Sequence, residues 1–424
     1  MADLWSNPFE RVVNRALIAE LGDSVFKKSV ALDRAFGKRE LKTGTQIEIP
    51  ISTGTDGQAA MFSPHGFDTD AAGSTSSGTS GNVDFREMNR VINLVVPFKA
   101  GGTQMRISEI RLRQSKGAEE KMDYLKLQAS GVKNSLKNMF ATQFITGSPE
   151  GTGSSTDISG LKALFETLSG STSVAYMSQS RSGSDALYPV VMDARSTGSA
   201  YTTGSISGVS GANFVTGSGS SWFSTTFPGD ELEMAGDSTI YRVVNVISNT
   251  SLEVTPDIAS TLTTVAFTIS RCFTNTTEYG NSGVVTLEKL DKCFWATQDG
   301  GDAPTIALSG SPMFSRVANK MIQNQRYMGQ SNKVGVNNYE SFKYHSADYV
   351  IDNFMPNGTV YFLNEDYNQV YALRGMDTPQ LEPGSLVKDY SSFQRASMIA
   401  EVNVVWNYAC RALNRQGKIS GFTA

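Results

Sequence analysis

The chain has 424 residues, of which only 18% are charged, and its formal net charge at pH 7 is −4. A chain of this length can bury more than one hydrophobic core, and its low charge and many glycines favour strands, turns and extended segments. The small acidic excess argues against a nucleic-acid-binding surface, because such surfaces need clustered Lys and Arg to displace counterions.

Cysteine usage and hydropathy argue against a secreted protein and against a membrane-spanning protein. Cys272, Cys293 and Cys410 are far apart and form no Cys-x-x-Cys pair, so we expect buried, reduced thiols from a reducing compartment. The first residues lack the basic and apolar regions of a secretion signal. No apolar run reaches the roughly 18 residues that a membrane span requires, so we expect no membrane partner.

The first predicted element is a short helix that begins at Pro8 and ends at Gly22. Residues 23–42 are mixed in character and carry the basic side chains Lys27, Lys28, Lys38, Arg39 and Lys42. We interpret residues 1–42 as an N-terminal arm that lies on something other than its own domain. A solvated extension is the alternative.

Two strands with a long polar tract between them predict a protruding hairpin. Residues 46–51 alternate between apolar and polar, and residues 91–96 form the return strand. The tract between them, residues 52–82, has too few apolar side chains for a core of its own. Because a two-stranded hairpin is marginal in water, we expect it to lie against a neighbouring subunit.

Residues 115–147 predict one long helix, with Ser115 as its N-cap and Gly147 and Pro149 at its end. A helix of this length is about 45 Å long, more than a compact domain needs, so we expect other elements to pack across it. Its apolar residues recur at steps of three and four and form one stripe: Met122, Leu125, Ala129, Val132, Leu136, Phe140 and Phe144.

The region 197–271 has no helical periodicity and reads as short strands separated by turns. Turn signals lie at 228–230 and 235–237, and the expected strands are residues 213–216, 231–234, 241–247, 251–255 and 265–269. Strands at this spacing predict a small β-barrel or sandwich, inserted in one piece at a surface loop.

Mixed helix and strand patterns return after Cys272. We expect a helix capped by Thr286 with Leu287, Leu290, Phe294 and Trp295 inside, and a second helix opened by Pro312 with Met313, Val317 and Met321 inside. The expected strands are residues 304–308, then 349–351 and 359–363 joined as a hairpin by the turn 356–358, and finally 398–408.

The sequence contains no recognisable catalytic or metal-binding constellation. Its two histidines, His65 and His345, have no partner at ligand spacing, and there is no phosphate-binding or nucleophile-elbow motif. The pairs Glu119–Glu120 and Glu365–Asp366 fit helix-dipole and turn roles, and we expect the scattered tryptophans to anchor packing: Trp5, Trp222, Trp295 and Trp406. We therefore predict no catalytic residue, cofactor-binding residue, metal ligand or cofactor, and no enzyme activity.

The order arm, hairpin, long helix, mixed domain, hairpin and terminal strand resembles the major capsid protein of tailed bacteriophages. The stretches that carry the resemblance are residues 46–51 and 91–98, 115–147, 285–322, 353–364 and 407–417. The insert, with residues 215–222 and 228–230, is similar to small β-modules of phage virion proteins. The resemblance covers nearly the whole chain, in architecture more than in motif.

This resemblance implies an α+β, HK97-like capsid fold with an inserted all-β barrel or sandwich domain. The implied divisions are an N-terminal arm (1–42), an extended loop (43–104), a peripheral domain with the spine helix (105–160), an axial domain in two parts (161–196 and 272–384), the inserted β-domain (197–271) and a C-terminal peripheral strand (385–424).

The implied function is assembly. Copies of the chain would form hexamers and pentamers that tile an icosahedral virion shell around packaged double-stranded DNA, without sequence-specific binding, after a procapsid forms in the host cytoplasm. A portal protein and possibly a cement or decoration protein would be further partners. The arm begins almost at Met1, so a separate scaffolding protein is expected.

One departure from the family concerns cross-linking, which some members perform through a lysine in the extended loop. No lysine lies between Lys42 and Lys99, so we do not expect such a cross-link here. Two alternatives remain: another virion component, such as a tail or decoration protein that binds a receptor through the β-insert, and a cytoplasmic enzyme whose site has no visible motif.

Overall fold

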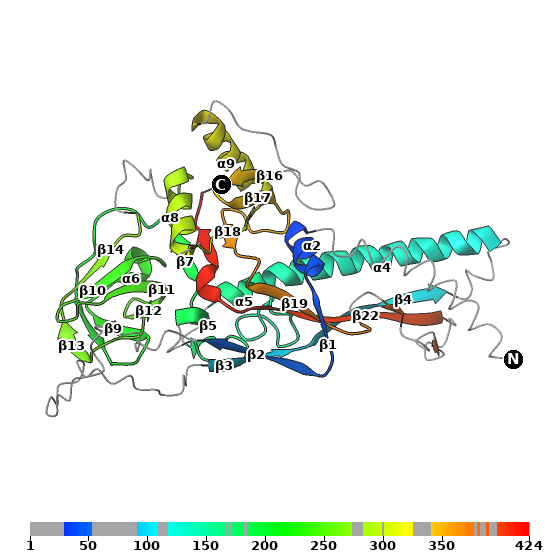
Figure 1. The fold of residues 1–424 in the computed structure, drawn as a ribbon, viewed down its shortest axis with the longest axis horizontal. Helices are drawn as coiled ribbons and strands as arrows, with labels where there is room; N and C mark the ends of the chain where they lie inside the picture. Colours follow the sequence, from blue (N-terminus) through cyan, green and yellow to red (C-terminus); the bar gives the residue numbers. More distant parts are fainter. Residues whose placement is uncertain are drawn as a thin grey trace, which may run out of the picture.

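A computed structural model of the chain was analysed. It describes residues 29–52, 91–108, 118–166, 168–169, 172–181, 185–273, 283–298, 301–324, 341–376, 380–381, 387–389 and 397–423. The described molecule is elongated, with a β-domain at one end and a long helix with two long strands at the other (Figure 1). None of its described helices is long and apolar enough to cross a membrane.

The long helix α4 (Ala118–Thr146) confirms the helix expected at 115–147. Four residues of the predicted stripe are buried, namely Val132, Leu136, Phe140 and Phe144. The proposed cap Ser115 and the side chains of Met122, Leu125 and Ala129 lie outside the described set. The helix ends as expected at Gly147, where an added Cβ would lie 2.3 Å from the carbonyl oxygen of Ile158, so only glycine fits.

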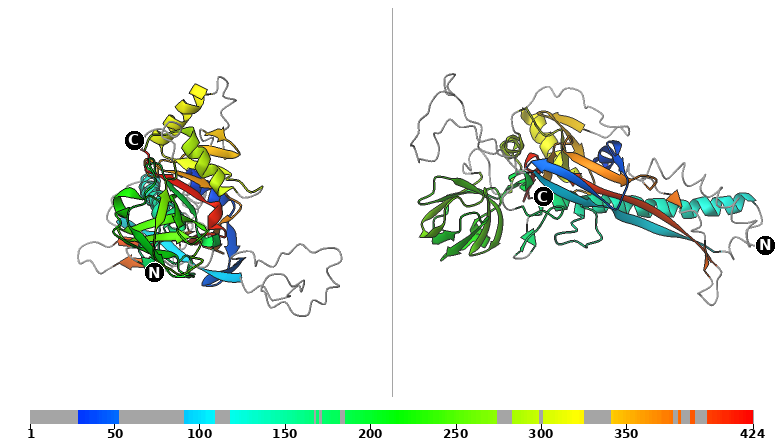
Figure 2. Two further views of the ribbon diagram at one scale, coloured as in Figure 1. Left: turned by 90° about the vertical axis from the view of Figure 1, so that its left-hand side faces the viewer. Right: turned by 60° about the horizontal axis from the view of Figure 1, so that its bottom comes forward.

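A sheet built on one 14-residue strand lies against this helix. The strand β22 (Ser397–Cys410) contains the strand predicted at 398–408 and pairs antiparallel with β4 (Lys99–Ser108) over ten registered residue pairs. The remaining members are β19 (Asn368–Leu373), β1 (Glu40–Lys42), β20 (Gln380–Leu381) and β21 (Val387–Asp389). Helix α4 runs alongside β4 and β22 beyond the other described elements (Figures 1 and 2).

Aromatic side chains join the sheet to the helix. Trp406 on β22 is fully buried, with ring centroids 5.8 Å from Phe140 of α4 and 4.7 Å from Phe36. Tyr408 lies two residues further along the same face of β22 and packs edge-on against Phe144, with ring centroids 5.0 Å apart. Such edge-to-face pairs add to the energy of burying the rings. The alternation of β22 and the stripe of α4 therefore meet in one core.

Residues 29–36 pack in this core, which corrects for this stretch the expectation that residues 1–42 lie on something other than their own domain. Helix α2 (Val30–Gly37) is capped by Ser29, whose hydroxyl accepts from the Leu32 N–H and donates to Asp352, and Phe36 packs on Trp406. Four apolar side chains of α2 are buried in the main core, and this local burial outweighs the basic composition of the segment. Residues 1–28, with the helix expected at 8–22, lie outside the described residues.

The predicted hairpin strands are present as β2 (Gln46–Ser52) and β3 (Val91–Pro97), paired antiparallel from Gln46–Pro97 to Ser52–Val91. One face of this ribbon packs on the chain's own core through Ile49, Ile51, Leu94 and Val96. The expectation that the strands themselves need a neighbouring subunit is therefore wrong, because their alternation supplies an apolar face that the same chain covers. The tract from residue 53 to residue 90 is not described.

A second sheet has the order β16 (Ser341–Tyr344), β17 (Ala347–Ile351), β15 (Ile306–Ser309), β18 (Val360–Leu363), β23 (Gly417–Ser420) and β7 (Val190–Asp193). The hairpin predicted from 349–351 and 359–363 is wrong, because β15 lies between β17 and β18 and pairs with both. All four residues of β15 are buried, as expected for a strand at the centre of a sheet.

Two helices pack with this second sheet. In α9 (Ser311–Asn324) the expected residues Met313, Val317 and Met321 are buried, which confirms that helix. In α8 (Leu287–Thr297) the Thr286 hydroxyl accepts from the Lys289 N–H as predicted. Trp295 was expected inside but is 55% exposed, because its position on α8 faces away from the sheet.

Residues 205–270 form a seven-stranded sheet with a hydrophobic core of its own. Its order is β13 (Leu262–Val265), β8 (Ser205–Gly208), β9 (Phe214–Ser218), β12 (Ser251–Thr255), β11 (Ile240–Ser248), β10 (Glu231–Met234) and β14 (Phe267–Ser270). The two end strands of this sheet, β13 and β14, are separated by Ala266 alone, so the two ends of the sheet lie close together, and we call this unit the barrel. The sequence did not predict β8 or separate β13 from β14.

The remaining short elements connect these parts. They are α5 (Leu161–Phe165), β5 (Leu168–Ser169), β6 (Thr172–Ser173), the 3-10 turn η2 (Asp185–Leu187), α6 (Trp222–Thr225) and the 3-10 turn η3 (Leu413–Arg415). Trp222 of α6 is fully buried in the barrel core against Phe267, so both Trp222 and Trp406 anchor packing as predicted. Trp5 lies outside the described residues.

The packing of α4 and α2 on β22 predicts the effect of removing the Trp406 ring. Trp406→Ala leaves a cavity between Phe36 and Phe140 and should lower the free energy of unfolding by about 3–5 kcal/mol. Urea denaturation of the purified chain measures this loss. The matched control, Trp295→Ala, removes a half-exposed ring and should cost below about 1 kcal/mol. Equal losses in the two variants would contradict the central role of Trp406.

Candidate functional site

His345, which is among the described residues, lies among aromatic rings beside one carboxylate. His345 follows β16, and its Nε2 lies 2.7 Å from the Asp291 carboxylate, which also accepts the Tyr344 hydroxyl. The imidazole lies among Phe294, Trp295 and Tyr344, with ring centroids within 5.2 Å. Burial and the Asp291 carboxylate raise the pKa of Tyr344 well above its usual value, so Tyr344 is held as a hydrogen-bond donor. His65 is not among the described residues.

Glu365 and Asp366 lie in different environments. Glu365 accepts a 2.6 Å ion pair from Arg34 and a hydrogen bond from Thr305, whereas Asp366 is exposed beside Lys38. Glu365 therefore fastens α2 to the turn before β19. Glu119 and Glu120 occupy the first turn of α4, as expected for a helix N-terminus, and their side chains are not described.

The thiols are buried, as the sequence predicted. Desolvation raises the pKa of Cys272 and of Cys410 to about 12 and raises that of Cys293 further, so none is a thiolate near neutral pH. Among the described residues, no three His, Cys, Asp or Glu side chains converge on a possible metal position.

The most concentrated polar cluster lies where the barrel joins the rest of the chain. Asp230 is fully buried, and its carboxylate accepts from the Ser196 hydroxyl, from the backbone N–H groups of Phe227 and Cys272, and from Arg271 at 3.1 Å. Ser196 precedes the barrel and Cys272 follows it. One carboxylate thus ties together the entering strand, the leaving strand and a turn of the barrel itself, and we call this group the Asp230 clamp.

The same turn seats the barrel on the edge of the second sheet. The N–H of Asp193, at the end of the edge strand β7, donates to the Pro228 carbonyl at 3.1 Å. Gly229 has a φ of +94°, and a Cβ there would lie 3.1 Å from the Val191 carbonyl oxygen, so this approach requires glycine. The turn therefore covers part of an edge that would otherwise be open to pairing.

A second buried contact joins the barrel to Tyr188, which lies between η2 and β7. The Asn213 side chain donates to Tyr188 at 2.6 Å and to the buried Glu253 at 3.3 Å. Burial and the Glu253 carboxylate raise the pKa of Tyr188, which keeps its hydroxyl protonated. Nearby, the fully buried Arg181 donates to four backbone carbonyls, those of Ala163, Leu164, Val174 and Leu187.

Sequence reasoning did not single out these joining residues. The segment 228–230 was predicted as a turn, and this is confirmed, but nothing local marks Asp230 as a buried ion-pair partner of Arg271. Three of its four partners, Ser196, Arg271 and Cys272, are 34 to 42 residues away along the chain. The sequence offered one signal: Asp230 stands in a predicted turn of a segment that is otherwise all β.

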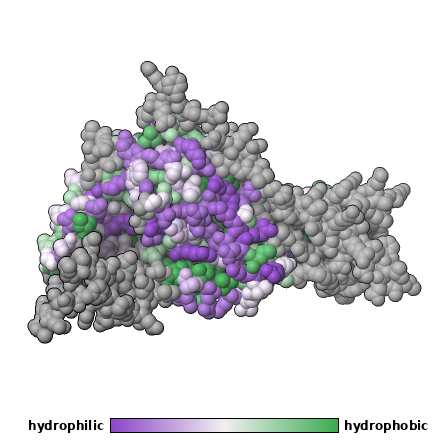
Figure 3. Space-filling model, in the orientation of Figure 1, coloured by the Kyte–Doolittle hydropathy of each residue, from purple (hydrophilic) through white to green (hydrophobic). Residues whose placement is uncertain are grey.

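Large exposed hydrophobic side chains are distributed over all parts of the described surface. They are Leu127 on α4, Phe223, Val209 and Ile240 on the barrel, Val284 and Trp295 at α8, Leu41 and Met376. On the face drawn in Figure 3, hydrophilic residues cover most of the described centre and hydrophobic ones gather near its lower margin. Such scattered exposure is compatible with several contact surfaces and does not mark one enclosed pocket.

No family model and no curated protein matches the chain by sequence. Among solved structures, it is similar to the capsid asymmetric unit of cyanophage A-1(L), with 10% identity, a TM-score of 0.52, and coverage of 96% of this chain and 94% of that one. It also matches the capsid of a native GTA particle (11% identity, 92% and 89% coverage, TM-score 0.41) and the SrpI encapsulin of Synechococcus elongatus PCC 7942 (7%, 78% and 77%, 0.37). The similarity to the cyanophage capsid extends over nearly the full length of both chains.

The clamp predicts how the barrel behaves when its carboxylate is removed. Asp230→Ala leaves Arg271 without its buried partner, at a cost of about 3–5 kcal/mol, and should loosen the junction without unfolding the barrel core. We expect trypsin cleavage after Arg195 and Arg271, on either side of the barrel, to accelerate by at least about tenfold. The control Asp237→Ala removes the acceptor of the Tyr241 hydroxyl within the barrel and should leave these two cleavage rates unchanged.

Proposed function

We propose that this chain, which has the mixed α+β, HK97-like capsid fold, is the major capsid protein of a tailed bacteriophage. Its copies form hexamers and pentamers that tile the icosahedral head shell around packaged double-stranded DNA. The observation that carries the proposal is the similarity to a phage capsid subunit over 96% of the chain at a TM-score of 0.52. The protein's place is the virion, and its role is structural and not enzymatic.

The described shape supports an assembly role. Helix α4 with β4 and β22 forms a long tongue beyond the rest of the molecule, and the ribbon of β2 and β3 lies at another side (Figure 2). Long, thin projections give a subunit several neighbours at once, and closed shells require many such repeated contacts.

We interpret the parts of the chain in terms of this fold. After the arm of residues 1–42, β2 and β3 form the base of the extended loop (43–104). The sheet of β22 with α4 corresponds to a peripheral domain (105–160 and 385–424), and the sheet of β15 corresponds to an axial domain (161–196 and 272–384). Residues 197–271 correspond to an inserted all-β domain. Some strands cross these boundaries: β19 and β20 pair in the sheet of β22, and β23 pairs in the sheet of β15.

The separate core of the barrel and its clamped connections support its interpretation as an insertion. Further partners in this proposal are a separate scaffolding protein during procapsid assembly, a portal protein, and a cement or decoration protein on the finished shell. The alternative that the chain is a tail or decoration protein that binds through the barrel has less support, because the structural similarity extends over the whole chain and not over the barrel alone.

Assembly of the purified chain tests the proposal. Expressed with candidate scaffolding proteins, the chain should yield capsomers and closed shells in negative-stain images, because its fold carries the contacts from which shells are built. The control omits the scaffold candidate and should give fewer or irregular shells. A chain that remains monomeric under every assembly condition would contradict a capsid function.

The missing loop lysine predicts how the assembled particle comes apart. No lysine lies between Lys42 and Lys99, so particles boiled in detergent should run as single 45.8 kDa chains, because non-covalent contacts alone hold the shell. A denaturing gel of purified particles measures this. A ladder of covalent multimers that resists reducing agent would show that another lysine forms cross-links.

A further inference from the structure

The turn of residues 176–179 departs from ordinary backbone geometry. Tyr176 and Gln179 exchange both of their backbone hydrogen bonds, at 2.9 and 3.0 Å, and so close a two-residue turn. Both central residues have a positive φ, +51° at Met177 and +65° at Ser178. Tight turns of this kind favour Asn and Gly, because a residue with a larger side chain is strained in the left-handed region. Two such residues in succession need surrounding contacts that hold them in place.

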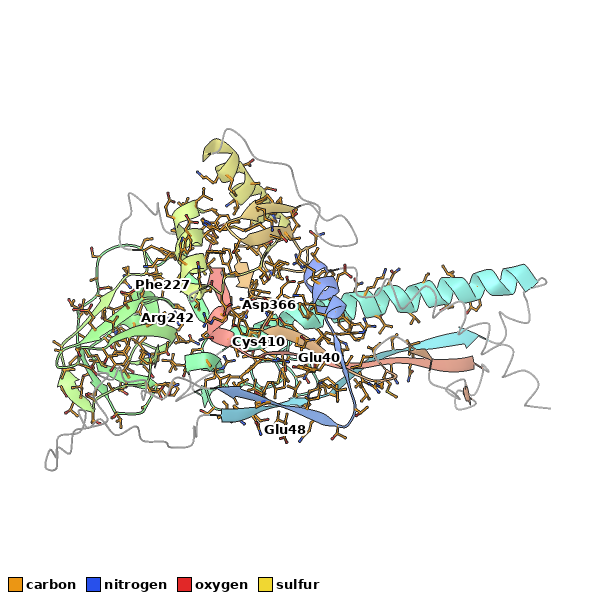
Figure 4. All side chains as sticks on the ribbon, in the orientation of Figure 1. Glu40, Glu48, Phe227, Arg242, Asp366 and Cys410 are labelled. Carbon is orange, nitrogen blue, oxygen red and sulfur yellow. The ribbon has the colours of Figure 1, made fainter. Side chains whose placement is uncertain are left out.

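Two buried side chains anchor this turn on the main core. Tyr176 and Met177 are both buried, and both belong to the same hydrophobic cluster as β22 and α4. The Tyr176 hydroxyl accepts from the N–H of Cys410, which ends β22 near the centre of the molecule (Figure 4). The sulfur of Met177 lies 3.9 Å from the hydroxyl of Ser159. The side chain that makes the left-handed conformation costly at Met177 therefore also attaches the turn to the core.

One carboxylate holds the outer side of the turn. Glu150, in the loop after α4, accepts the N–H of Ser178 at 2.9 Å. This N–H belongs to the second left-handed residue, so the hydrogen bond favours the strained shape of the turn over a relaxed shape. Both residues are exposed, so water competes for this bond, whereas the contacts of Tyr176 and Met177 are buried. The Glu150 bond is therefore the attachment of the turn that opens most easily.

The turn supplies hydrogen bonds to the edge of the β2–β3 ribbon. The N–H of Val95 on β3 donates to the Met177 carbonyl at 3.2 Å, and the side-chain amide of Gln179 donates to the Asn93 carbonyl at 2.8 Å. Val95 lies opposite Glu48 of β2 (Figure 4), but its N–H bonds to the turn. The turn therefore acts as a short third strand for a two-stranded ribbon, which is marginal in water by itself.

We propose that residues 176–179 form a strained latch for the β2–β3 ribbon of the same chain, with Glu150 as the group that keeps the latch closed. In the closed state, the left-handed turn presents the Met177 carbonyl and the Gln179 amide to β3. When the Glu150 bond is lost, the strain favours a relaxed turn, which withdraws both groups from the ribbon. The buried Tyr176 stays in the core, so the opening is local. The inference concerns a single chain and does not depend on the capsid function.

Hydrogen–deuterium exchange of the purified chain tests the latch. The Val95 amide, resolved by fragmentation in the mass spectrometer, reports the bond between ribbon and turn, and the amides of β22 report opening of the main core. Glu150→Ala should raise the Val95 exchange rate about fivefold and leave the β22 rates unchanged. Glu150→Gln retains an acceptor oxygen and should restore most of the protection. The control Glu233→Ala removes an exposed carboxylate of the barrel and should change neither rate.

Removal of the strain supplies a measurement with the opposite sign. Glycine adopts a positive φ without a steric penalty, so Ser178→Gly stabilises the closed turn and should slow exchange of the Val95 amide about threefold. The matched control is Thr264→Gly, which replaces an exposed residue of the barrel with a φ of +55°. This control relieves a similar strain in β13 and should leave the Val95 rate unchanged.

Two results would overturn the inference. One is a Val95 exchange rate that is the same in the unaltered chain, in Glu150→Ala and in Ser178→Gly. The other is an equal acceleration of the Val95 and β22 amides in Glu150→Ala, which would show that the turn opens only when the main core unfolds. Neither result bears on the capsid function, which the assembly experiment tests separately.

Discussion

The burial of Trp406 between two helices is the contact on which the rest of the molecule depends. The indole lies on the longest strand, and it packs against Phe140 of α4 on one side and Phe36 of α2 on the other. Strand β22 is also the partner of β4, which continues from the ribbon strand β3 after a single residue. The spine helix, the tongue and the base of the ribbon are therefore aligned by one aromatic core.

The barrel is joined to this framework by a different kind of interaction. Its hydrophobic core is separate from the other two, so packing inside the barrel does not determine how the barrel is oriented. The orientation depends on polar contacts: the buried Asp230 carboxylate and its four donors, and the hydrogen bond from Asp193 to Pro228. Buried polar groups lose much more than apolar ones when they are mispaired, so such contacts specify one arrangement.

This division of labour suits the proposed role in assembly. The main core makes the elongated framework rigid, while the clamp holds a second folded unit at its edge and covers part of the open strand β7. A sheet edge left open would pair with any available strand, whereas one that is covered leaves association to designated surfaces.

The sequence by itself determined those elements whose signal is local. The stripe of α4, the alternation of β2, β3 and β22, the caps at Thr286 and Gly147 and most barrel strands follow from spacing and turn residues, and the order of elements was sufficient to indicate the capsid fold. Only the tertiary structure decided that β15 separates β17 from β18, that Trp295 faces solvent, that α2 belongs to the main core, and that Asp230 joins Ser196, Arg271 and Cys272. Periodicity reports which face of an element is apolar, but burial depends on what distant segment covers that face, and a charge pair depends on which residues the fold brings together.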